Sequence, residues 1–60
     1  MTIDPEYYYL CVYDSDREIY TVKEQFPTFE RAIGRAVELK VGERNVISGA
    51  RLIEMGLTEY

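Results

Sequence analysis

Sixty residues leave room for one domain with a modest core, and too little chain for a second lobe that would enclose a deep cleft. A single cysteine and the absence of histidine exclude an internal disulfide and the usual zinc sites built from cysteine and histidine. Residues 1–24 carry six acidic and two basic side chains, whereas residues 25–60 carry five of each, so the amino-terminal part holds the whole net charge of −4. This distribution disfavours binding to a phosphate backbone and favours a basic partner.

The amino terminus lacks the basic start and apolar run of a signal peptide, and no apolar stretch approaches the roughly 18 residues of a membrane span. We therefore expect a cytoplasmic protein, folded as a single domain over residues 1–60, with no cofactor, no metal and no membrane contact. Because neither a disulfide nor a metal stabilises so small a core, self-association would supply additional buried surface. A homodimer is therefore one expectation.

The first predicted element is a β-hairpin. Residues 7–13 are dense in aromatic and branched side chains, which favour strands, and residues 18–24 alternate apolar and polar in their middle. Between them lie Asp14, Ser15 and Asp16, whose short polar side chains favour turns.

A helix is predicted after the hairpin. Pro27 ends the second strand because proline cannot donate to a β-ladder, and Thr28 is suited to cap a helix that begins at Phe29. Apolar residues then recur at helical spacing, which predicts a helix to about residue 41 with one apolar face on the sheet. Gly34 lowers helix stability by about 1 kcal/mol relative to alanine, and Gly42 is suited to the carboxyl-terminal stop.

The last predicted element is a strand over residues 45–55, interrupted at Ser48 and Gly49. The interruption is either a bulge in one long strand, which we favour, or the turn of a second hairpin. Residues 56–60 are expected to fray. The predicted fold is α+β with the order ββαβ: a small antiparallel sheet of three strands, or four with the second hairpin, and one helix packed on one face.

The register of the hairpin decides which side chains face outward. A three-residue loop over residues 15–17 would separate Tyr7, Tyr9 and Tyr13 from Tyr20, whereas a two-residue loop would group Tyr20 with Tyr9. One helix can cover only one face. Either register is therefore expected to leave a tyrosine-bearing face exposed.

The exposed tyrosines and the acidic turn form the predicted binding surface. Tyrosine supplies a large, fairly rigid contact area with a polar tip and is enriched at interface hot spots, although strand propensity alone also places it at the rim of small cores. The carboxylates around the turn either are simply solvated or form an acidic surface that binds a basic partner. The candidate partner-binding residues are Tyr7, Tyr9, Tyr13, Asp14, Asp16 and Glu18.

Other chemistries find little support in the sequence. The acidic turn resembles the start of a calcium loop, but Ile19 and Gln25 stand where an EF-hand needs glycine and glutamate. No histidine is present to activate a serine, and Cys11 has no identifiable base beside it, so we expect it to act as a small apolar filler. Aromatic side chains on an open sheet can stack on single-stranded bases, but the surrounding carboxylates oppose such binding.

The segment Phe26-Pro-Thr-Phe-Glu-Arg-Ala-Ile, after a short aromatic hairpin and before a final strand, resembles in style the small acidic orphan proteins of bacteria, phages and other mobile elements. Inhibitors of host defence, including the anti-CRISPR proteins, are among them. The resemblance implies a protein that binds a nuclease complex, often with carboxylates where nucleic-acid phosphates would sit. These inhibitors share no common motif, so the resemblance assigns no site residue.

Three functional hypotheses result. The leading one is a non-catalytic protein-binding module, of the phage or mobile-element inhibitor type, that engages a basic protein surface through its tyrosine-rich acidic hairpin. The alternative is a homodimeric structural or accessory domain that hides the tyrosine face against its own copy. The second alternative is a single-stranded nucleic-acid binder.

Overall fold

The computed structural model describes all of residues 1–60 and contains one sheet and two α-helices. The elements are β1 (Tyr8–Asp14), β2 (Ile19–Phe26), α1 (Phe29–Glu38), a 3-10 turn η1 (Glu43–Asn45), β3 (Val46–Ser48) and α2 (Gly49–Glu54). The three strands are antiparallel in the order β2-β1-β3, so β1 is central. The predicted α+β class with a three-stranded antiparallel sheet is confirmed. Neither helix has the length and apolar content needed to cross a bilayer.

The hairpin turn has four residues, so neither predicted loop length is right. Asp14 pairs with Ile19 across the ladder, and residues 15–18 form the turn. One carboxylate oxygen of Asp14 accepts the backbone N–H groups of Asp16 and Arg17 at 3.0 and 3.3 Å, and Glu18 adopts a left-handed φ of 56°. The side chains are divided between the two faces of the sheet as a two-residue loop would divide them, because loops of two and of four residues both contain an even number of residues.

A β-bulge interrupts the β1–β2 ladder. Leu10 pairs with Glu24 whereas Cys11 pairs with Val22, so Lys23 is an extra residue on β2. A bulge of this kind bends the strand and increases its local twist. β2 is an edge strand over its full length, because only β1 pairs with it.

Helix α1 covers one face of the sheet. The Thr28 hydroxyl accepts the N–H of Arg31 at 3.2 Å, as its N-cap role predicts. Ala32 and Ala36 are fully buried, and their small side chains let the helix approach the sheet closely, where Leu10 of β1 is also buried.

The helix ends at Glu38, earlier than predicted, in a Schellman arrangement. Lys40 donates to the carbonyl of Val37, and Val41 donates to that of Ala36. Lys40, and not Gly42, takes the left-handed conformation, with a φ of 58°.

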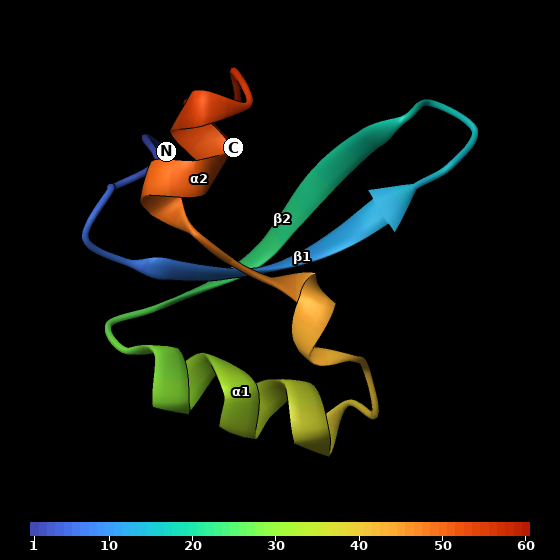
Figure 1. Cartoon of the computed structure of the whole chain (residues 1–60), viewed down its shortest axis with the longest axis vertical. Helices are drawn as coiled ribbons and strands as arrows, with labels where there is room; N and C mark the ends of the chain where they lie inside the picture. Colours follow the sequence, from blue (N-terminus) through green and yellow to red (C-terminus); the bar gives the residue numbers. More distant parts are fainter.

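The second helix was not predicted. The chain leaves the sheet after Ser48, whose hydroxyl accepts the N–H of Arg51 at 3.1 Å and caps α2. The strand expected over residues 45–55 is therefore wrong beyond Ser48, and the interruption is neither a bulge nor a turn. Figure 1 shows α1 on one side of the strands and α2, close to both chain ends, on the other. Both faces of the sheet are thus covered at the base of the hairpin.

The face opposite α1 carries most of the core. Ile3, Tyr9, Cys11 and Leu52 form a buried cluster that brings together the amino-terminal segment, β1 and α2. Burial raises the pKa of the Cys11 thiol to about 11, consistent with a small apolar filler.

The two chain ends pair with one another. The prediction that residues 56–60 fray is therefore wrong. The N–H of Ile3 donates to the carbonyl of Thr58 at 2.8 Å, and the N–H of Tyr60 donates to that of Met1 at 2.8 Å. The Tyr60 ring packs edge-on against Tyr9, with centroids 5.7 Å apart.

Candidate protein-binding site

Tyr9 is not part of an exposed tyrosine face. Its side chain is completely buried, and its hydroxyl accepts the backbone N–H of Asp4 at 2.8 Å. The expectation that Tyr9 contacts a partner is wrong, because α2 and the chain ends cover this part of the sheet. A helix in place of the expected strand thus removes the central residue of the predicted surface.

Tyr7 is exposed but lies away from the turn. It precedes β1 by one residue, whereas Tyr13 lies six residues further on, near the opposite end of that strand. At about 3.3 Å per residue, the two positions are roughly 20 Å apart. The structure therefore does not join Tyr7 to the acidic turn in one compact surface.

Tyr13, which is exposed, and Tyr20, which is half-buried against the core, form the aromatic pair of the hairpin. They face each other across β1 and β2, with ring centroids 5.0 Å apart and planes tilted by 59°. The Tyr13 side chain is 49% exposed. Tyr20 was missing from the predicted site, although the correct register alone would have placed it beside Tyr13.

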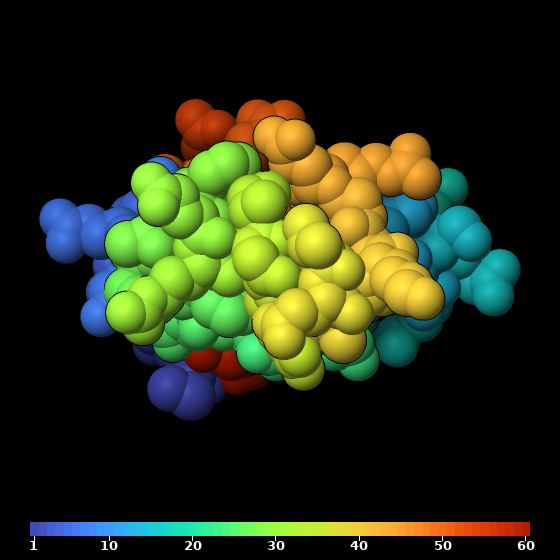
Figure 2. Space-filling view, turned by 90° about the horizontal axis from the view of Figure 1, so that it is seen from below, coloured from blue at the N-terminus to red at the C-terminus, as the bar shows by residue number.

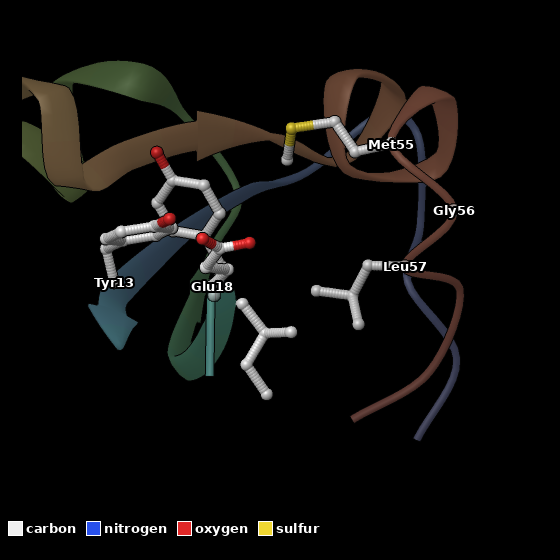
Figure 3. Close-up of a pocket in the computed structure, with 7 residues that line it drawn as sticks. Tyr13, Glu18, Met55, Gly56 and Leu57 are labelled. Carbon is white, nitrogen blue, oxygen red and sulfur yellow. The ribbon is translucent and has the colours of Figure 1, made fainter. Parts of the chain in front are cut away.

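A hollow of about 330 Å³ lies on one side of this pair, between the hairpin and the residues that follow α2. It exists because α2 covers Tyr9 and Cys11 but ends before it reaches Tyr13. Figure 3 shows the Met55 side chain extending toward Tyr13, and Leu57 facing the hollow from the same side as Met55. The lining residues are Tyr13, Glu18, Ile19, Tyr20, Met55, Gly56 and Leu57.

A second hollow, of about 450 Å³, lies on the other side of the pair. Its walls are Val12 and the η1 residues Arg44 and Asn45, and it shares only Tyr13 and Tyr20 with the first. The Asn45 side-chain amide donates to the carbonyl of Cys11 at 2.8 Å, which fixes this end of η1 against β1. The tyrosine pair is therefore a ridge between two depressions.

The acidic turn borders the ridge. Glu18 lines the first hollow directly, and Asp16 is exposed at the tip. One oxygen of the half-buried Asp14 carboxylate already holds the turn, whereas neither Asp16 nor Glu18 forms an ion pair within the chain. Of the predicted site residues, Tyr13, Asp14, Asp16 and Glu18 thus lie together, and Tyr7 and Tyr9 do not.

The remaining side chains offer no second chemical centre. No three histidine, cysteine, aspartate or glutamate side chains lie together in a way that could hold a metal ion. Cys11 is the one thiol, and it is inaccessible. No family model, curated protein or solved structure matches the chain.

Proposed function

We propose that the chain is a non-catalytic protein-binding module that engages a basic partner through the Tyr13–Tyr20 ridge and the acidic turn. The observation that carries the proposal is the aromatic pair of exposed Tyr13 and half-buried Tyr20, which stands between two hollows and beside two carboxylates without ion-pair partners. Tyrosine pairs of this kind supply rigid contact area at little cost in side-chain entropy.

The chemistry of the first hollow favours an arginine or lysine of the partner. The long aliphatic stem of such a residue would pack on Met55 and the ring of Tyr20, while its cationic group would reach Glu18. An arginine can in addition lie over a tyrosine face as a cation–π contact. The partner's apolar and charged groups would then be recognised by one continuous surface.

An inhibitory role follows when the partner's basic surface is one that binds nucleic acid. The carboxylates of Asp14, Asp16 and Glu18 would then occupy positions that phosphates otherwise take. Binding would weaken as salt increases, because exposed charges are screened beyond about 10 Å at 0.1 M salt.

The experiment is cross-linked capture with matched variants. Tyr13→Ala and Tyr20→Ala remove the ridge, Glu18→Lys reverses the charge beside it, and Tyr7→Ala removes an exposed tyrosine far from it. We expect a partner captured by the wild type and by Tyr7→Ala to be lost from the other three. Equal capture by all variants, with circular dichroism confirming that each is folded, would contradict the proposal.

Single-stranded nucleic acid is the competing occupant that one observation favours. Arg44 lies beside the second hollow and forms no ion pair within the chain, so it could contact a phosphate while a base stacks on Tyr13. The carboxylates of the turn oppose this arrangement. A fluorescence titration with a labelled oligonucleotide at low salt tests it, and saturable binding lost in Arg44→Glu would replace the protein-binding proposal.

A further inference from the structure

The outer flank of α1 is uncovered and carries both apolar and charged side chains. Ala32 and Ala36 face the sheet, whereas Val37 is 70% exposed and Ile33 is half-buried. In the view of Figure 2, the residues of α1, from green to yellow, lie at the front of the molecule with no other segment over them. This flank belongs to the face of the sheet opposite α2.

Gly34 lies on this flank and has no role within the chain. A Cβ atom added at Gly34 would meet nothing within 4 Å, so no neighbouring group requires a glycine there. In the middle of a ten-residue helix, it lowers helix stability by about 1 kcal/mol relative to alanine. A glycine does, however, let the backbone of a second helix approach closely.

The charges on this flank are arranged in a self-complementary way. Glu30, Gly34 and Val37 follow the spacing i, i+4, i+7 and therefore lie along one line of the helix. Glu30 is near the start of that line, and Lys40 follows the last residue of the helix, Glu38, by two positions. Both are exposed, and neither forms an ion pair within the chain.

We propose that α1 packs antiparallel against α1 of a second copy of this chain, with Gly34 close to the crossing point. A two-fold axis level with position 35 would place Val37 of one copy against Ile33 of the other. The same axis would place Glu30 against Lys40 of the other copy. Each contact then occurs twice, as in every isologous dimer.

A second copy fits this flank better than an unrelated protein. When two copies of the helix lie antiparallel, the acidic end of each faces the basic end of the other. The helix has ten residues and is about 15 Å long. The contact is thus smaller than the roughly 600 Å² per partner of the smallest standard interfaces. We therefore expect a weak dimer that forms at micromolar or higher concentration and dissociates on dilution.

The test is sedimentation equilibrium of the whole chain over about a hundredfold range of concentration. Gly34→Gln places a good helix former in open space, so the monomer should melt at a higher temperature while the dimer is lost. These opposite effects cannot arise from misfolding. Lys40→Glu should weaken the dimer at least several-fold, and adding Glu30→Lys to it should restore association.

Three outcomes would overturn the inference: a monomer at every concentration, unchanged association in Gly34→Gln, or no restoration in the charge-reversed double variant. Tyr13→Ala is the matched control, because it removes apolar surface from the ridge and leaves α1 unchanged. Loss of association in Tyr13→Ala would place the contact on the ridge and not on α1. The three outcomes named first leave the proposed partner-binding function unaffected, whereas self-association through the ridge would occupy the surface that this function requires.

Discussion

Gly49 is the glycine at which the addition of a methyl group should destabilise the fold most. It is buried at the junction of β3 and α2, and its N–H donates to the carbonyl of Tyr7 at 2.8 Å. A Cβ atom at this position would overlap the carbonyl oxygen of Asp4, lie 2.8 Å from the carbonyl carbon and lie 3.1 Å from the Tyr9 ring. The first two obstacles are backbone atoms, so a change of side-chain rotamer cannot relieve them.

The expected cost of Gly49→Ala follows from what must move. Overpacking a core costs about 1 to 3 kcal/mol, and separating Asp4 from α2 would also strain the hydrogen bond from its N–H to the Tyr9 hydroxyl, worth roughly 1 kcal/mol. The total is about 2 to 4 kcal/mol. At roughly 0.05 to 0.15 kcal/mol per residue, a chain of this length has about 3 to 9 kcal/mol of stability, so the loss is a large part of it.

Urea unfolding followed by circular dichroism measures this cost, and Gly34→Ala is the matched control. Gly34 has open space around it, so its substitution should raise the free energy of unfolding by about 1 kcal/mol. The two glycine-to-alanine changes are thus expected to have opposite signs. A Gly49→Ala variant within about 0.5 kcal/mol of the wild type would refute the close approach of Asp4 to α2.

Three further predictions concern the turn, the helix end and the buried thiol. Lys40→Gly should raise the free energy of unfolding by about 1 kcal/mol, because glycine adopts the left-handed φ of 58° without a Cβ penalty; a destabilised variant in urea unfolding would contradict this. Asp14→Ala should lower the melting temperature by removing an acceptor of two backbone N–H groups, at a cost of about 1 kcal/mol, whereas Asp16→Ala, which removes no such bond, should not; equal melting temperatures would count against the turn described. The pKa of Cys11 is about 11 in the folded chain against 9.0 for an ordinary thiol, so its contribution is complete below pH 9 and lost as pH rises through 11. The free energy of unfolding, measured from pH 8 to 11, should therefore fall more steeply with pH for the wild type than for Cys11→Ala. Parallel curves would show that the thiol is not buried.

The hairpin and α1 could be predicted because their signals are local. Strand propensity, the turn residues and the Thr28 cap each act within a few residues of where they occur. The exact turn was missed because the side chain of Asp14, by accepting two N–H groups, supports a four-residue loop where shorter loops are commoner. Tyr20 was absent from the predicted site because that site followed the three-residue register, although the two-residue alternative grouped Tyr20 with Tyr9.

Helix α2 was missed because a short apolar run does not distinguish a strand from a helix. Ser48 and Gly49 were interpreted together as a bulge or a turn. Serine is, however, also among the best N-cap residues, and Gly49 is needed for a close approach of Asp4. The burial of Tyr9 then followed from a contact between residues far apart in sequence. No local pattern around Tyr9 carries that information.

The bulge at Lys23 bears on how readily the open edge of β2 could pair with strands of other molecules. β2 presents an open edge of eight residues, and a regular edge of that length is a template to which strands of other molecules can add without limit. The extra residue breaks the spacing of the backbone N–H and carbonyl groups in mid-strand and places an exposed cation there. A neighbouring strand could then pair with only half of the edge at a time, so the sheet ends at β2 and fibre growth has no continuous surface on which to begin.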